Sequence, residues 1–481
     1  MNRRMILHTL GQIIRLEAVL LLLPAGVALL YHEERCLKAF LLTALLALLL
    51  GTLLTLPTRS RSRVIFSKEG FVTVALAWLC LSAIGALPFV LSGGMPSYVD
   101  AFFETVSGLT TTGSSVIPDV EILPRGLLFW RSFTHWIGGM GILVLMMAIV
   151  PSDSGRSMHM MRAEMPGPVV GKLVPRVRDT AKILYIIYLV LTAVMVVLLR
   201  CGGMSLYDSF VHAFGAAGTG GFGVYRNSLA GFSPYIQWVV TIFMLLFGVN
   251  FNLYYLILAR HFRSAIKSRE LWAYLGLVLA SSGLIAWNIR ALYSTAGETI
   301  RQAMFQVSSI ITTTGYATTD FNRWPGLSKA VLLLLMFVGG CAGSTAGGLK
   351  VSRVQLLGAS ARRELRRALH PRSVASVRLE GKRVEESTVQ GAGAYLVLYV
   401  ALLALGFLLI SFEPFGLESN LTAVITCLNN VGPGFGEVGP TGGFAAYSDF
   451  SKIVLSLEML FGRLEIYPLL FLLSPSTWTK K

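Results

Sequence analysis

The chain has 481 residues, of which 54% are hydrophobic and 14% charged, and its formal net charge is +16. A soluble domain carries about 25% charged residues, whereas a helix that crosses a bilayer needs about 20 consecutive apolar residues. Uncharged apolar runs of that length, such as 39–57 and 71–92, recur along this chain. The composition therefore predicts a polytopic, all-α membrane protein and excludes a mainly soluble enzyme.

Two apolar helices are predicted first, over 5–30 and 36–56, and the rest of the chain repeats one pattern four times. Each repeat has a long apolar helix, a short amphipathic segment, a polar loop with glycine, and a second long helix. The first helices are predicted over 71–92, 181–201, 270–293 and 391–412. The short segments are predicted over 98–109, 205–217, 297–311 and 417–428. The second helices are predicted over 125–150, 234–261, 327–337 and 449–473, and only the third is expected to break outright.

This pattern divides the chain into an N-terminal helix pair and four pore repeats around one pore. Residues 1–68 hold the two extra transmembrane helices and a loop. The repeats occupy 69–179, 180–269, 270–389 and 390–481, and the third contains an intramembrane loop and a basic segment.

Basic residues gather in alternate loops, over 59–68, 156–178, 260–269 and 350–383, while the other loops carry acidic residues such as Asp119 and Glu437. The positive-inside rule assigns the basic loops and both termini to the cytoplasm. Topology thus accounts for the net charge, and nucleic-acid binding is not expected. The segment 350–383 is a candidate docking surface for a cytosolic regulator, for anionic membrane lipids, or for both.

The short segments are expected to be re-entrant, because a helix of about 12 residues rises only about 18 Å and a bilayer core is about 30 Å thick. Each is followed by four residues that we call a glycine loop. A monovalent cation loses its water to inward-pointing carbonyl oxygens on an extended backbone, and glycine tolerates the dihedral angles required. One such loop would be ordinary turn composition, but four in the same context indicate a selectivity filter. Its residues are Thr110, Thr111, Thr112 and Gly113; Gly218, Thr219, Gly220 and Gly221; Thr312, Thr313, Thr314 and Gly315; and Asn429, Asn430, Val431 and Gly432.

Residues 218–223 also match the G-x-G-x-x-G pattern of dinucleotide-binding folds. That pattern requires a preceding strand and a following helix within a βαβ unit, whereas a short apolar helix precedes it here. No organic cofactor is therefore expected. His135 is expected to be a packed helix residue rather than a proton relay, and neither the histidines nor the five cysteines show metal-ligand spacing.

The second helix of the third repeat runs into ten residues, 339–348, of which five are glycine. Close helix packing explains such residues elsewhere, as in Gly138–Gly141. Here we expect a loop beneath the filter that blocks the pathway and moves, because irregular backbone at membrane depth is tolerated where it lines a cavity. The predicted gate residues are Gly340, Gly343, Ser344, Thr345, Gly347 and Gly348, together with Arg463.

Arg463 lies inside an apolar run, and a central arginine costs at least about 2.5–3.5 kcal/mol in a membrane. It should therefore face a cavity or a partner from another helix or loop. We expect it to hydrogen-bond the loop 340–348 and to be the one cation placed for the pore. Snorkelling to the cytoplasm, the alternative, fits poorly because about ten residues follow it.

The four repeats, the filter glycines, the glycine-rich interruption and the arginine resemble the superfamily of potassium transporters that contains TrkH, KtrB and the plant HKT proteins. The N-terminal helix pair and the stretch 135–141 resemble the TrkH branch. The resemblance implies K⁺ uptake across the bacterial inner membrane, a homodimer, K⁺ as the permeant ion, and gating by a cytosolic nucleotide-binding subunit of the TrkA type. Some Na⁺-preferring plant relatives have serine at the first filter glycine, and Gly113 argues against that preference. A Na⁺-coupled or Na⁺-permeable transporter is the alternative, and a membrane enzyme is not expected.

Overall fold

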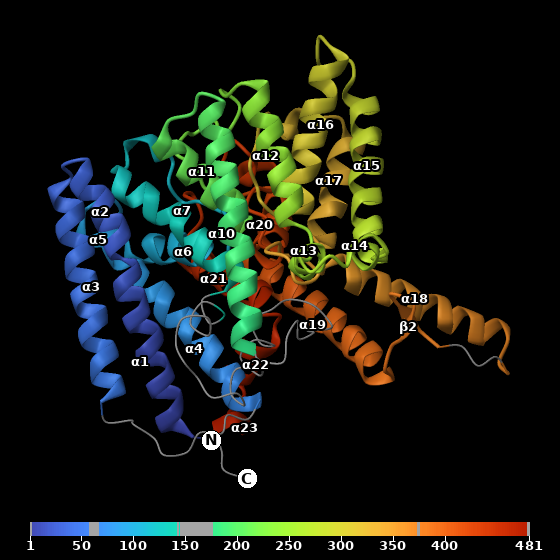
Figure 1. Ribbon diagram of the computed structural model, residues 1–481, viewed down its shortest axis with the longest axis horizontal. Helices are drawn as coiled ribbons and strands as arrows, with labels where there is room; N and C mark the ends of the chain where they lie inside the picture. The colour runs from blue at the N-terminus through green and yellow to red at the C-terminus, as the bar shows by residue number, and fades with distance from the viewer. Residues whose placement is uncertain (1, 57–66, 142–143, 145–176, 373–375, 479–481) are drawn as a thin grey trace.

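The structure is a computed structural model that describes residues 2–56, 67–141, 144, 177–372 and 376–478. Within these ranges the chain is a bundle of helices (Figure 1), and its strands are β1 (Arg378–Leu379) and β2 (Lys382–Arg383), which pair as one short hairpin. This confirms the predicted all-α class. The basic residues between 59 and 63 and those between 156 and 176 lie outside the described ranges.

Six described helices or helix pairs are long and apolar enough to cross a membrane, and a bent pair adds a possible seventh. The N-terminal span joins α1 (Arg3–Leu20) and α2 (Leu22–Leu30), and the third span joins α4 (Ser67–Gly85) and α5 (Leu87–Leu91). The other spans are α3 (Glu34–Thr55), α10 (Val177–Cys201), α15 (Arg269–Ile289) and α19 (Glu386–Ile410).

Each short segment forms a helix close to its predicted position. In three of them a hydroxyl at the N-cap accepts the backbone N–H of an acidic residue three positions later, as Ser97 does from Asp100. This capping satisfies an amide that the helix leaves unpaired, and the acidic side chain suits the positive end of the helix dipole. The four are α6 (Tyr98–Leu109), α11 (Leu206–Gly218), α16 (Ala296–Ile311) and α20 (Leu417–Asn429).

The second helices differ from prediction, because the third is not alone in breaking. Helix α12 (Pro234–Phe247) bends by 89° into α13 (Phe251–Leu258), and α21 (Asp449–Arg463) ends before α22 (Tyr467–Leu473). Asn250 caps the start of α13 and so separates it from α12. Ile466 has φ of +68°, which is incompatible with a right-handed helix, and so separates α21 from α22. The continuous helices predicted over 234–261 and 449–473 were therefore wrong.

The other two second helices end at glycines. Helix α7 (Arg125–Met140) stops at Gly141, whose φ is +83°, and most of the predicted remainder to 150 lies outside the described residues. Helix α17 (Gly326–Val338) stops at Gly339, whose φ is +73°. The remaining described helices are α14 (Phe262–Ile266), α18 (Val351–Leu369), α23 (Pro475–Trp478), η1 (Val120–Ile122), η2 (Phe321–Arg323) and η3 (Gly436–Val438).

Packing joins the last repeat to the first. Each short helix contacts the second helix of its own repeat, and α21 also contacts α6. One buried apolar cluster combines residues of α3, α4, α6 and α7 with residues of α20, α21 and α22. In Figure 1 the N-terminal helices flank the rest of the bundle on one side, and α18 projects from the other.

Candidate ion pathway

The four glycine loops share one backbone conformation although their side chains differ. The second residue of each loop is left-handed, with φ of +57° at Thr111, +57° at Thr219, +53° at Thr313 and +54° at Asn430. The closing glycines are also at positive φ, with +82° at Gly113, +79° at Gly221, +82° at Gly315 and +99° at Gly432. Residues with a Cβ rarely adopt this region. Four matching departures from ordinary backbone therefore align the loops with one another.

The glycine loops also follow one another around a ring. A Cβ added to Gly113 would lie 1.8 Å from the carbonyl oxygen of Gly220, and one added to Gly221 would lie 2.1 Å from that of Thr314. A Cβ on Gly315 would lie 2.5 Å from Val431 O, and one on Gly432 would lie 2.8 Å from Thr112 O. Each glycine thus faces the next loop in sequence, and the last faces the first. No side chain fits at these contacts, which leaves backbone oxygens around a single axis.

A cavity of about 130 Å³ adjoins all four closing glycines. Most of its lining residues belong to the segments that follow the four loops, and Arg131 and Arg226 are the charged residues among them. A volume of this size holds several water molecules. The ring therefore adjoins a cavity that is large enough for several water molecules.

Side chains hold the loops from behind. In the first and third loops the first and third threonines hydrogen-bond through their hydroxyls. The Oγ1 atoms of Thr110 and Thr112 lie 2.8 Å apart, as do those of Thr312 and Thr314. In the fourth loop, Asn430 Nδ2 donates to Thr112 Oγ1 at 3.0 Å, which joins the last loop to the first.

A buried ion pair that we did not predict from the sequence braces the first two loops. Glu104 Oε1 lies 2.6 Å from Arg131 Nη2, and both side chains are at most 2% exposed. Glu104 also accepts the backbone N–H of Val116 at 3.0 Å, and Arg131 Nη1 donates to Gly223 O at 3.4 Å. The signal available was a glutamate on the short helix α6 and an arginine within the apolar helix α7.

The other loops are held by hydrogen bonds between uncharged groups instead of an ion pair. Thr422 Oγ1 and the backbone of Phe435 exchange hydrogen bonds of 3.0 and 3.3 Å behind the fourth loop. Tyr316 Oη donates to His212 O and to Phe222 O, both at 3.0 Å, and so connects the second repeat to the third.

The loop after α17, which we call the inner loop (residues 339–350), contacts the ring through residues that do not line the cavity. The backbone N–H of Gly347 donates to Thr313 Oγ1 at 2.6 Å, and that of Gly348 donates to Asn429 O at 3.1 Å. Thr345 Oγ1 donates to Phe247 O at 3.2 Å. Of the predicted gate residues, Gly340, Gly343, Ser344, Thr345, Gly347 and Gly348 all belong to this segment, and Gly343 and Gly348 have positive φ.

Arg463 connects the inner loop to the ring. Its Nη1 atom donates to Thr345 O at 3.0 Å and to Thr111 Oγ1 at 3.3 Å. Its Nη2 atom donates to the carbonyl oxygens of Gly138 and Gly139, both at 2.6 Å. The hydrogen bond that we expected between Arg463 and the loop 340–348 is therefore present. The guanidinium supplies positive charge to oxygens that would otherwise attract a cation.

Arg463 is not the one buried cation near the pathway, which corrects our expectation. Lys350 is 1% exposed, has φ of +73°, and donates through Nζ to Ala346 O. Arg131 and Arg353 are also buried. The sequence places Lys350 in the basic segment 350–383, because nothing in its sequence neighbourhood distinguishes a buried lysine from an exposed one.

His135 is fully buried beside the ring. Its Nδ1 atom lies 2.8 Å from Gly108 O, and its ring centroid lies 4.3 Å from that of Phe222. A Cβ on Gly220 would lie 2.3 Å from His135 Nδ1, so the imidazole supports the second loop by contact. This packing matches the structural role that the sequence predicted.

The described residues contain no cluster of three His, Cys, Asp or Glu side chains that could hold a metal ion. The G-x-G-x-x-G stretch lies at the end of α11, and α12 is the next helix. No strand precedes it within the described part of that repeat, so it lacks the context of a dinucleotide site.

Comparison with known proteins agrees with this geometry. Residues 36–281 and 290–480 match the TrkH family model, which is described as a cation transport protein. The chain belongs to the TrkH family. Membership in this family of transporters also confirms that the chain is not an enzyme, as the sequence predicted.

Relatives in the TrkH family extend over the whole chain. The Trk system potassium uptake protein TrkH of Escherichia coli K12 is 37% identical over 485 residues, covering 99% of this chain and 100% of the relative. The protein of the same name from Halomonas elongata is 34% identical and covers both chains fully. The crystal structure of the potassium transporter TrkH from Vibrio parahaemolyticus superposes with a TM-score of 0.89, at 36% identity and full coverage of both chains.

Proposed function

We propose that this TrkH-family protein takes up K⁺ through one pore whose selectivity filter is the ring of four glycine loops. The observation that carries the proposal is the cyclic contact of the closing glycines, in which each glycine adjoins a backbone oxygen of the next loop. Such a ring offers carbonyl oxygens in place of the hydration shell of a monovalent cation. The relatives named potassium uptake proteins support K⁺ as the ion.

The inner loop and Arg463 form the gate in this proposal. The loop contacts Thr313 and Asn429 of the ring, and Arg463 donates to both Thr345 O and Thr111 Oγ1. A guanidinium at this position opposes a cation leaving the filter. Opening then requires the loop and Arg463 to separate from the ring.

The setting proposed is the bacterial inner membrane, with both termini and the basic segment 350–383 in the cytoplasm and four repeats bounded as the sequence predicts. The positive-inside rule supports this orientation. The family relationship supports a homodimer and a cytosolic nucleotide-binding subunit of the TrkA type. Helix α18, which projects from the bundle and carries exposed arginines such as Arg362 and Arg366, is the docking surface that we assign to that subunit.

The proposal is tested by ⁸⁶Rb⁺ uptake into K⁺-loaded proteoliposomes, with protein-free liposomes as the control. We expect saturable uptake that external K⁺ inhibits and equal Na⁺ does not. Uptake inhibited equally by Na⁺ would favour the alternative, a Na⁺-permeable or Na⁺-coupled transporter. No uptake above that of protein-free liposomes would overturn the proposal.

A further inference from the structure

The backbone break that follows Arg463 is held in an unusual conformation. Glu465 and Ile466 have φ of +56° and +68°, a region that residues with a Cβ rarely adopt, and Ile466 is β-branched as well. Such a conformation persists only where the surroundings enforce it. The contacts that enforce this one therefore also fix the end of α21, where Arg463 lies.

One contact to this break comes from α18. The Nη2 atom of Arg353 forms an ion pair with Glu465 Oε2, and the two side chains are 5% and 19% exposed. Arg353 Nη1 also donates to Leu349 O at 2.9 Å, and its guanidinium lies 3.9 Å from the ring centroid of Tyr395. Arg353 is thus held by the inner loop and by α19 while it holds Glu465.

The first turn of α18 is equally tied to the inner loop. The backbone N–H of Val351 donates to Gly340 O at 3.0 Å. One carboxylate oxygen of Glu270 accepts the backbone N–H of Ala342 at 2.7 Å and that of Ser352 at 3.2 Å. Glu270 therefore caps α18 and the inner loop together, from the start of α15.

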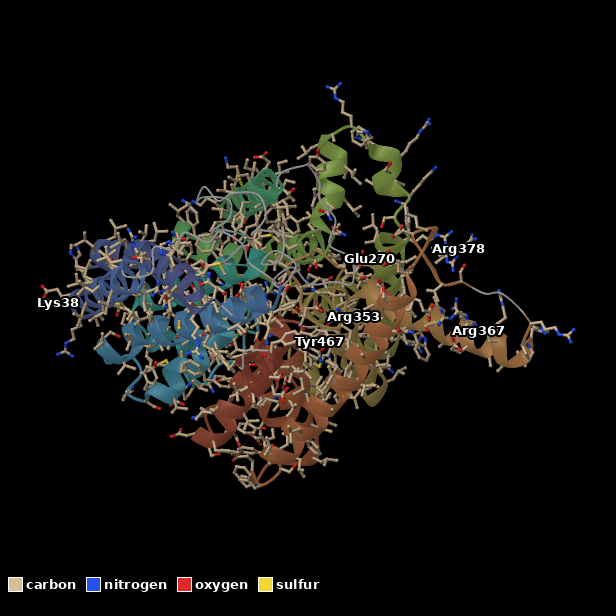
Figure 2. The ribbon with its side chains drawn as sticks, turned by 90° about the horizontal axis from the view of Figure 1, so that it is seen from below. Lys38, Glu270, Arg353, Arg367, Arg378 and Tyr467 are labelled. Carbon is tan, nitrogen blue, oxygen red and sulfur yellow. The ribbon has the colours of Figure 1, made fainter. Side chains whose placement is uncertain are left out.

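The hairpin outside the bundle reaches the same point. Glu380, between β1 and β2, accepts the backbone N–H groups of Arg269 and Glu270, both at 2.9 Å. Figure 2 shows Glu270, Arg353 and Tyr467 close together where α18 leaves the bundle, with Arg367 and Arg378 farther out along the projecting arm. Displacement of the projecting part of α18 and of the β1–β2 hairpin would therefore displace the first turn of α18 directly.

We propose that Arg353 and Glu465 are positioning residues for Arg463. Their ion pair links the first turn of the projecting helix α18 to the backbone break two residues after Arg463. In this arrangement the guanidinium of Arg463 stays on Thr345 O and Thr111 Oγ1 only while α18 keeps its place. The inference rests on the proposed function, and it assigns to α18 a route to Arg463 that is separate from the covalent connection of α18 to the inner loop.

The test is basal ⁸⁶Rb⁺ uptake into proteoliposomes, without any regulatory subunit, for Glu465→Gln, Arg463→Ala and the double variant. A hydrogen bond to a charged group is worth about tenfold or more in an equilibrium. Because glutamine keeps a neutral acceptor, we expect Glu465→Gln to raise uptake by about tenfold, the lower end of that range. In the Arg463→Ala background the same substitution should change nothing, because its effect passes through Arg463. A purely structural brace would give no such dependence on Arg463.

Arg353→Gln removes the pair from the other side and should reproduce both results, which keeps the test valid if one variant folds poorly. Lys329→Gln breaks the partly exposed pair with Glu418, at 3.0 Å, and should leave uptake unchanged. An equal effect of Glu465→Gln with and without Arg463, or no effect in either background, would overturn the inference. Absence of uptake by the unmodified protein would instead overturn the proposed function.

Discussion

The pathway has two parts that differ in how far the four repeats resemble one another. We call the ring of four glycine loops the outer half, and the second helices with the inner loop the inner half. On the outer side the four glycine loops repeat one backbone, with left-handed second residues and closing glycines at positive φ. On the inner side the second helices end in different ways: α7 and α17 stop at glycines, α12 bends by 89° into α13, and α21 ends at Arg463 before α22. A site that surrounds an ion can use similar backbone oxygens from all four repeats. A gate can be formed by a segment of one repeat, such as the inner loop.

The largest effect is expected from the ring itself. Gly113→Ala places a Cβ 1.8 Å from Gly220 O at a residue whose φ is +82°. The left-handed conformation alone costs about 1–2 kcal/mol for a residue with a Cβ, and the overlap adds to that. We expect ⁸⁶Rb⁺ uptake to fall by at least about tenfold.

Gly283→Ala is the matched control for that substitution, because no heavy atom lies within 4 Å of its added Cβ. It should retain uptake close to that of the unmodified protein. Normal uptake and ion selectivity in Gly113→Ala would show that the ring does not conduct.

The second effect concerns the inner half. Arg463→Ala removes the donor to Thr345 O, Thr111 Oγ1 and the α7 carbonyls. Basal ⁸⁶Rb⁺ uptake should therefore rise by at least about tenfold, the lower limit for a single charge-assisted hydrogen bond. Arg290→Ala, at an exposed position, serves as the control and should change nothing. Unchanged uptake in Arg463→Ala would remove Arg463 from the gate.

The third effect tests how the outer half is braced. Arg131→Met leaves Glu104 buried without its cation, and breaking a buried pair in this way costs about 3–5 kcal/mol. We expect a lower unfolding temperature in detergent and weaker discrimination of Rb⁺ from Na⁺. Arg323→Gln breaks an ion pair whose arginine is 87% exposed, for which about 0–1 kcal/mol is expected. Equal losses in the two variants would contradict the bracing role.

The smallest effect compares two loops of identical sequence. Thr112→Val and Thr314→Val each remove a 2.8 Å hydroxyl contact, but Thr112 also accepts Asn430 Nδ2 at 3.0 Å. Each hydrogen bond contributes about 0.5–1.5 kcal/mol. Thermal unfolding should therefore show a larger loss for Thr112→Val, and a larger loss for Thr314→Val would contradict the link between the first and last loops.

Local signals predicted the outer half well. Ser97 with Asp100, and the apolar periodicity after them, are enough to start α6 at Tyr98, and the glycine at the end of each loop marks where the backbone must turn. Hence the positions of the short helices and the alignment of the four loops could be predicted from the sequence. The ion pair of Glu104 with Arg131 could not, because its partners lie 27 residues apart on different helices.

The breaks in the second helices of the inner half could not be predicted either, because they also depend on contacts between distant residues. A single glycine within an apolar run, Gly248, is not enough to predict the 89° bend between α12 and α13. The bend depends on Asn250, which caps α13, and on the backbone N–H of Cys341, which donates to Gly248 O at 2.9 Å. The break at Glu465 contains no glycine and depends on Arg353, more than 100 residues away. Contacts between repeats, rather than local propensity, decide where these helices end.

The central claim is that selection resides in the outer ring and gating in the inner loop with Arg463. The most direct measurement is ⁸⁶Rb⁺ uptake in the presence of competing K⁺ or Na⁺, compared between the unmodified protein and Arg463→Ala. The account predicts faster uptake in Arg463→Ala with unchanged inhibition by K⁺ and unchanged insensitivity to Na⁺. Inhibition by Na⁺ that appears only in Arg463→Ala would contradict it, because selection would then depend on the inner half.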